Sequence, residues 1–323
     1  MLSRVAERVY WLGRYIERME SAARLINVNS NLLLDLPKDV HLGWPSLIDI
    51  MGCHEEFQAK NLKDEELSVV RFLMADLSNP ASIYTSIKLA RENARTTREI
   101  IPTEAWELIN DLYFYVKENI GRSTSRAQRQ IFLRYVVQNC QQFVGMMAGT
   151  MSHTNAYDFI RLGRNLERAD MTTRIVDVGT VNLITNTKVQ KTQGGDALEP
   201  YINILWMSVL QSMSAYQMYR QHVLDRVNGE DVVTFMLQDE DFPRSVLSCL
   251  SALVTCLNKL PEGDEALKAV ATAQRHIKTV NVADLLANDS LHEFIDTIQR
   301  DIASINNEIA KKWFLPVEIY EES

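Results

Sequence analysis

The sequence predicts an all-α fold: a helical bundle built from two internally duplicated halves with pseudo-two-fold symmetry. Long stretches carry apolar residues at the spacing of an α-helix. The 323 residues include only 12 Gly and 8 Pro, too few for a turn-rich β protein. A charged motif near the start of the chain also returns in the middle. The halves are expected over 1–151 and 152–323. Because no Pro- and Ser-rich linker separates them, we expect a single domain over 1–323.

The first expected helix covers residues 3–34, where Ser3 can cap the first turn and Pro37 follows the end. At about 100° per residue, one face is an apolar stripe of Leu12, Ile16, Met19, Ala23 and Ile26. Beside it runs a row made of Gly13, Glu17, Glu20 and Arg24. A helix with an apolar stripe next to a charged row is expected in the middle of a bundle.

The stretch from Leu12 to Glu20 returns as the stretch from Leu162 to Asp170. Both copies read L-G-R-x-φ-E-R-x-[ED]-x-x-x-R-φ-φ-x-V, where φ is an aliphatic residue. So many charged positions at a fixed spacing indicate an internal duplication. The second copy predicts a helix over 155–184 that is equivalent to the first.

Caps and breaks predict the remaining helices. Asn79-Pro80 is typical of a helix start, and Ser290 with Glu293 forms a capping-box pattern. The polar stretch 186–196 contains Gly194-Gly195 and is expected as an exposed loop. The other helices are expected over 44–57, 65–75, 80–98, 102–119, 123–151, 200–224, 230–237, 243–258, 264–279 and 290–314.

The correspondence between the halves extends past the motif. Residues 44–57 match residues 206–219 at an offset of 162, and residues 70–83 match residues 233–246 at an offset of 163. The offset grows from 150 at the motif to 162, so the second half carries about twelve extra residues (162 − 150). These fit the expected loop at 186–196.

Composition limits the class of protein. A formal charge of −8 disfavours a nucleic-acid binder, which would present a basic surface. The four Cys residues include no C-x-x-C, which is typical of buried, reduced thiols rather than a disulfide framework. No signal-peptide pattern and no apolar run long enough to span a bilayer is found. We expect a cytoplasmic protein without nucleic-acid or membrane partners.

The charged positions of the two copies are the main candidate site: Arg14, Glu17, Arg18, Glu20, Arg24, Arg164, Glu167, Arg168, Asp170 and Arg174. One interpretation is a buried ion-pair network across the pseudo-two-fold, which the cost of unpaired buried charge favours. The other is a polar pocket for an anionic or peptide-like ligand, with these anion clamps: Arg14, Arg18, Arg164 and Arg168. The carboxylates could also face a divalent cation, but the adjacent arginines would repel it, so no metal site is expected.

A second group of candidates lies outside the motif: Arg91, Glu92, Asn93, Arg95 and Arg244. Glu92 and Arg95 are within pairing reach on one helix, which favours a salt-bridged face. Arg244 follows Pro243 and is expected in the first turn of a helix, where the helix dipole disfavours a cation. It is therefore a candidate for binding an acidic partner, or for pairing with Asp239 or Asp241.

Several motifs together resemble those of the bacterial alpha-E domain family. They are Leu-Gly-Arg-x-x-Glu-Arg in both copies, residues 90–95 followed by Arg98-Glu99, Trp106-Glu107 with Asn110, and residues 242–246. The resemblance covers essentially the whole chain. It implies an all-helical protein without an established activity. It also implies links, by gene neighbourhood and fusion, to ATP-grasp ligase-like proteins and to transglutaminase-like or amidohydrolase-like proteins.

Three functional hypotheses follow. The first is a non-catalytic scaffold or ligand-binding accessory protein of a system that forms or modifies peptide or amide bonds, for which no cofactor is expected. The second is an enzyme of that system, with Glu17 and Glu167 as acid and base. The sequence contains no G-x-S-x-G, Walker A, G-x-G-x-x-G or H-E-x-x-H motif. The third is a structural protein that forms homo-oligomers. Paired, buried carboxylates would argue against the enzyme, and unpaired ones in a cavity would favour it.

Overall fold

The computed structural model describes residues 3–35, 43–123, 125–193 and 199–315, with only the backbone at 33–35, 181–193 and 199–201. All the regular elements in these ranges are α-helices, so the all-α prediction is confirmed. They are α1 Ser3–Asp35, α2 Pro45–Met51, α3 His54–Ala59, α4 Glu66–Ala75, α5 Ile83–Thr96, α6 Thr103–Asn119, α7 Arg126–Thr150, α8 Asn155–Gln193, α9 Glu199–Ser212, α10 Tyr216–His222, α11 Gly229–Gln238, α12 Val246–Leu257, α13 Asp264–Thr279, α14 Val282–Ala287 and α15 Leu291–Trp313.

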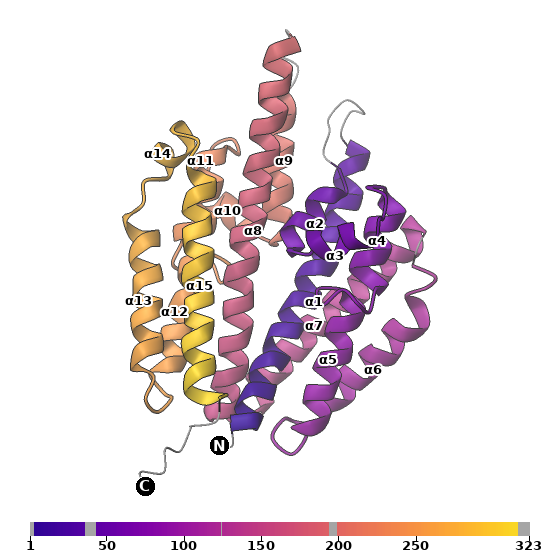
Figure 1. Cartoon of the computed structure of the whole chain (residues 1–323), viewed down its shortest axis with the longest axis vertical. Coiled ribbons are helices and arrows are strands. Elements are labelled where there is room, and N and C mark those ends of the chain that lie inside the picture. Colours follow the sequence, from indigo (N-terminus) through magenta and orange to yellow (C-terminus); the bar gives the residue numbers. More distant parts are fainter. Residues whose placement is uncertain (1–2, 36–42, 124, 194–198, 316–323) are drawn as a thin grey trace.

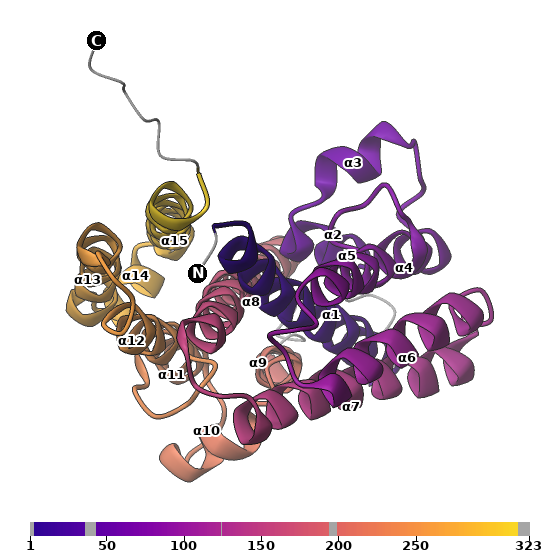
Figure 2. The same cartoon turned by 90° about the horizontal axis from the view of Figure 1, so that it is seen from below.

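The two motif helices, α1 and α8, lie side by side in the middle of the bundle (Figure 1). Helices α5 and α7 pack on α1, and helices α12 and α15 pack on α8 (Figure 2). The apolar stripes of both central helices are buried, for example at Leu12 and Leu162, each 0% exposed. Buried side chains from both halves join in one hydrophobic core. The motif helices therefore occupy the position that their mixed apolar and charged faces predict.

Two glycines set the distance between α1 and α8. A Cβ atom on Gly13 would lie 2.2 Å from the carbonyl oxygen of Ile160, and one on Gly163 would lie 2.0 Å from that of Tyr10. Only a residue without a side chain permits so close an approach of two backbones. The two contacts are reciprocal at the offset of 150, as the predicted duplication requires; the duplication itself stays a prediction.

Two expected helices are each divided in two. The stretch 44–57 breaks at Gly52 and the stretch 200–224 breaks at Ser214, two positions that correspond at the offset of 162. Both residues have a left-handed backbone, with φ of 63° at Gly52 and 53° at Ser214. Glycine adopts this conformation without strain, whereas serine does not. Nothing in the pattern around Ser214 indicates such a turn, which is why the prediction missed it.

The loop expected at 186–196 is wrong for residues 186–193, because α8 continues to Gln193. The stretch is polar, but it contains no Gly or Pro before Gly194, and polarity alone does not end a helix. Residues 194–196 lie outside the described residues, as does Pro37. The helix α14, at 282–287, was not predicted.

Three expected helix starts need correction. Ser82 caps α5 by accepting from the amide of Thr85, and Ser245 caps α12 in the same way, so both helices begin after the expected prolines. Arg244 therefore precedes its helix, and the expected conflict with the dipole does not arise. The expected capping box at the start of α15 is wrong, because Ser290 donates to the carbonyl of Leu285 instead of capping the helix.

Candidate ligand-binding site at the Glu-Arg crossing

Glu17 lies on α1 near the point where this helix crosses α8, which we call the crossing. Its side chain is 0% exposed. Arg168 of α8 donates to both of its carboxylate oxygens, from Nε to Oε1 over 2.8 Å and from Nη2 to Oε2 over 2.7 Å. Arg244 donates a third bond, from Nη1 to Oε1 over 2.8 Å. All three hydrogen bonds come from guanidinium groups of the other half of the chain.

Glu167 of α8 has the reciprocal arrangement. Arg18 of α1 donates from Nε to Oε1 over 2.5 Å and from Nη2 to Oε2 over 3.1 Å. The third bond comes from Arg14 of α1, from Nε to Oε2 over 2.7 Å. The structure thus contains the ion-pair network that one interpretation of the motif predicts.

The network keeps both carboxyl groups ionised. Burial by itself raises the pKa of Glu17, but the charges of Arg168 and Arg244 and the hydrogen bonds of Arg168 outweigh it and lower the pKa to about 2. At Glu167, burial is likewise outweighed by Arg18 and Arg14, and the pKa is again about 2. Two carboxylates in this state hold no proton near neutral pH.

In each motif helix, the charged residues that follow the Glu-Arg pair form an ion pair within the same helix. Arg24 donates to Glu20 over 2.7 Å, and Arg174 donates to Asp170 over 2.9 Å, both at i,i+4 spacing. Arg244 bridges Glu17 and Glu20 and makes no ion pair with Asp239 or Asp241, which corrects the expected partners. Arg14 lies three residues before Glu17 in the sequence but pairs with Glu167 of the other helix.

Arg14 and Arg164 correspond at the offset of 150 but differ in their contacts. Arg14 is shared between Glu167 and Asn306, to which it donates from Nη1 over 2.8 Å. The Nε of Arg164 is buried without a hydrogen-bond partner in the described part of the chain. Burial and the charge of Arg168 lower the pKa of Arg164. Arg244 fills the place at Glu17 that Arg164 would otherwise take.

A solvent-open groove of about 740 Å³ lies beside Arg14, between α8 and α15. We call it the Arg14 groove and define it by the polar residues that line it: Arg14, Asp170, Arg174, Asp296, Gln299, Arg300, Asn306 and Asn307. Its volume is in the range of small-molecule binding sites. On the other side of the crossing, beside Arg164, the space between α1 and α7 is only about 10 Å³.

The motif thus predicted three of the residues in this groove, and the residues from α15 were missed. A signal for them exists, because an offset of 162 also aligns the buried faces of α7 and α15, through the pairs Leu133/Ile295, Val136/Ile298, Cys140/Ile302, Phe143/Ile305 and Met147/Ile309. At this offset Val137 and Val144 correspond to Gln299 and Asn306. The two valines pack half-buried on the core, whereas the two amides line the groove.

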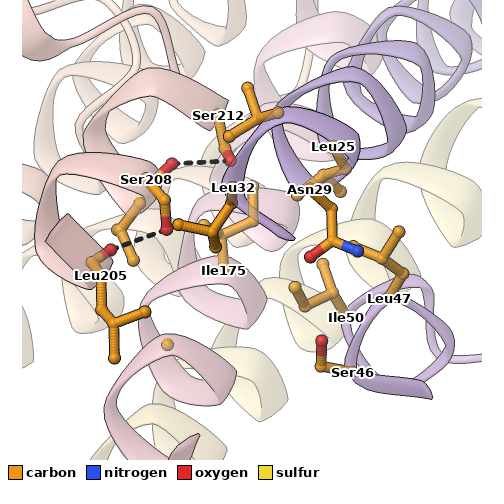
Figure 3. A pocket seen from close by; sticks show the side chains of 13 residues that line it. Leu25, Asn29, Leu32, Ser46, Leu47, Ile50, Ile175, Leu205, Ser208 and Ser212 are labelled. Atoms are coloured by element: carbon orange, nitrogen blue, oxygen red, sulfur yellow. Dashed lines mark hydrogen bonds between the residues drawn. The ribbon is translucent and has the colours of Figure 1, made fainter. Parts of the chain in front are cut away.

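A second pocket, of about 60 Å³, lies between α1, α2, α8 and α9 (Figure 3). Its lining is mostly apolar, with Asn29 among leucine and isoleucine side chains and two serines that bond backbone carbonyls of their own helix (Figure 3). The amide nitrogen of Asn29 is buried without a hydrogen-bond partner among the described residues. The room suffices for a few water molecules, which would satisfy this nitrogen.

Apart from Arg244, the second group of candidates lies on α5, away from the crossing. Arg91 donates from Nε to Oδ1 of Asn110 over 2.9 Å, and its guanidinium lies 4.7 Å from the ring centre of Tyr113. Arg95 pairs with Glu92 over 2.7 Å on an exposed face, as predicted. The side chain of Asn93 makes no hydrogen bond in the described structure, although its carbonyl accepts from Thr96 and Thr97. These residues form a salt-bridged surface that does not join the groove.

The structure also shows the residues that a cysteine-based site, a metal site or a membrane span would use. The four cysteines, all within the described ranges, are free and buried. Among the described residues, no three His, Cys, Asp or Glu side chains are grouped so that they could hold a metal ion. Nor is any helix there long and apolar enough to cross a membrane.

The family model that matches the chain covers residues 1–314 and is described as alpha-E, a predicted alpha-helical domain with a conserved ER motif. The chain belongs to the alpha-E family. The Glu-Arg pairs at 17–18 and 167–168, which meet at the crossing of α1 and α8, fit that description. Comparisons with curated proteins and with solved structures give no match. The geometry of the alpha-E motif therefore has to be interpreted from this chain itself.

Proposed function

We propose that this alpha-E chain is a non-catalytic helical scaffold and ligand-binding accessory protein in the bacterial cytoplasm. It serves an ATP-grasp-linked system that forms or modifies peptide or amide bonds, alongside ligase-like and transglutaminase-like proteins. The pathway part rests on the family and on the associations that the resemblance implies. The molecular part rests on the state of Glu17 and Glu167.

The single observation behind the non-catalytic role is that each motif carboxylate accepts three guanidinium hydrogen bonds in the interior. A general acid must hold a proton near the working pH, and a general base must reach the substrate. With a pKa of about 2 and almost no exposure, neither Glu17 nor Glu167 meets these needs. The geometry therefore weighs against the acid-base alternative, while the adjacent groove supports binding.

Purification of the tagged chain from its native host tests the pathway part. An ATP-grasp ligase-like or transglutaminase-like protein should co-purify, and its product formation should depend on the added chain. The absence of both kinds of partner would contradict the proposal. An untagged strain supplies the background.

Amide variants test the molecular part. In the single variants Glu17→Gln and Glu167→Gln, any loss of product formation should follow the loss of folded protein. Glu92→Gln makes the same chemical change at an exposed ion pair and is the matched control. A Glu17→Gln or Glu167→Gln protein that stays folded and partner-bound but forms no product would instead establish the acid-base alternative.

A further inference from the structure

The Arg14 groove exists because the two sides of the crossing are closed differently. On one side, Val137 and Val144 of α7 pack on the core. On the other, α15 presents Gln299 and Asn306 at the corresponding positions. Amide side chains remain solvated unless their hydrogen bonds are replaced, so they do not close a helix interface as valines do. The polar groove therefore results from the amide side chains that α15 presents on this side.

The cationic groups in the groove outnumber its carboxylates. Arg14, Arg174 and Arg300 line it, whereas Asp170 and Asp296 are the acidic residues of its lining. Arg14 already pairs with Glu167, and Arg174 pairs with Asp170. Arg300 donates only to its own helix, to the carbonyl of Asp296 and to a threonine hydroxyl, and no carboxylate pairs with it in the described structure. Arginine forks that retain free N–H groups are well suited to bind carboxylates.

The groove is elongated along α15. Its lining from this helix runs from Asp296 to Asn307, eleven steps that span about 16 Å at 1.5 Å per residue. That length matches four or five residues of an extended peptide at about 3.3 Å each. Gln299 and Asn307 supply both donors and acceptors along it, as peptide groups require. Asn306 adds its amide N–H groups, because its Oδ1 already accepts from Tyr10 and Arg14. Ala303 lies midway and adds little bulk.

We propose that the Arg14 groove binds a short peptide with a free carboxylate, held by the arginines at the carboxylate and by the α15 amides along the backbone. Asp170 and Asp296 accept from the N–H groups or the amino end of the same peptide. This inference deepens the ligand-binding part of the proposed function and rests on it. It does not depend on which protein is the partner.

Calorimetric titration of the purified full chain tests the inference, with tetraalanine as the probe at millimolar concentration. Tetraalanine amide, which lacks the free carboxylate, and inorganic phosphate are the matched ligand controls. Tetraalanine should bind, and its amide should bind at least tenfold more weakly, as expected for one lost charge-assisted contact of about 1.4 kcal/mol. The exposed Arg300→Ala variant should weaken tetraalanine binding to a similar extent.

Two phenylalanine variants test the location. Ala303→Phe fills the middle of the groove and should abolish binding. Ser304→Phe places the same side chain at the next exposed position of α15, outside the lining, and should bind like the parent. Both positions are exposed, so circular dichroism melts should remain unchanged.

Three results would overturn the inference: no tetraalanine binding, binding unaffected by Ala303→Phe, or phosphate and tetraalanine amide binding as well as tetraalanine. Such a failure leaves the test of the proposed function intact. Co-purification of a ligase-like partner does not require an occupied groove, whereas the absence of a partner would contradict the proposed function even if tetraalanine bound.

Discussion

Glu17 and Glu167 occupy corresponding positions of α1 and α8, and each accepts three guanidinium hydrogen bonds. The third donor differs: Arg244 serves Glu17, whereas Arg14 serves Glu167. The outer helices differ as well, since α7 packs closely on one side and α15 leaves a groove on the other. One motif can therefore build a closed structural contact at one site and border a solvent-open groove at the other.

Acid should have the largest effect on the free energy of unfolding, because it protonates both carboxylates at once. The pKa of each group is about 2 in the folded chain and 4.5 ordinarily. The charged form therefore stabilises the fold fully above pH 4.5, and this contribution is lost as the pH falls from 4.5 toward 2. Urea unfolding between pH 7 and pH 2 should show a stability that falls steeply below pH 4.5. A free energy of unfolding that does not change below pH 4.5 would contradict the ion-pair network.

The next largest effect should come from Glu17→Gln, because it leaves the charge of Arg168 without its carboxylate partner in a closed interior and leaves Arg244 with Glu20 alone. A cost of about 3–5 kcal/mol in the free energy of unfolding is expected. Glu167→Gln should cost less, about 1–3 kcal/mol, since Arg14 keeps Asn306 and borders the solvent-open groove. Urea denaturation of both variants measures the difference. Equal costs would mean that the two sides are energetically alike.

Gly13→Ala and Gly163→Ala should each destabilise the crossing that both sides share. The added methyl groups would meet backbone oxygens at 2.2 and 2.0 Å, which forces α1 and α8 apart at a cost of about 1–3 kcal/mol. Gly145 of α7 is the control, because a Cβ there meets nothing within 4 Å. Gly145→Ala should stabilise the chain through helix propensity. Melting temperatures that change in the same direction in all three variants would contradict the close approach of α1 and α8.

The smallest effect is expected at the exposed pair on α5. Arg95 and Glu92 lie 2.7 Å apart, with about half of each side chain in solvent. Water screens such a pair, so Arg95→Ala should leave the melting temperature unchanged within error. A clear drop in the melting temperature would contradict the expected difference between the buried ion pairs at the crossing and this exposed pair.

The sequence predicted the helical class, the central place of the two motif helices and the local pair Glu92–Arg95, because each depends on residues close in sequence. One of the two interpretations of the motif also predicted that arginines would pair with carboxylates across the two halves. The same reasoning failed at Ser214, where a left-handed serine breaks a helix without a local signal. It failed at 186–193, where polar residues stay helical.

The choice of partners could not be predicted from spacing. Arg14 has Glu17 three residues away but binds Glu167, and Arg244 binds two residues more than 220 positions earlier in the chain. The pairing of Arg14 follows from the close approach of α1 and α8 at Gly13 and Gly163. That of Arg244 follows from the contact of its segment with α8, where its carbonyl accepts from Thr172. The sequence shows neither contact.

By itself, the sequence determined that two equivalent helices carry apolar stripes beside Glu-Arg rows, since period and residue type suffice for that. Only the tertiary structure decided that Glu17 is sealed and that Glu167 lies next to a groove. The physical reason is that burial and charge pairing depend on the outer helices. Val137 and Val144 close one side, whereas Gln299 and Asn306 line an open groove on the other side.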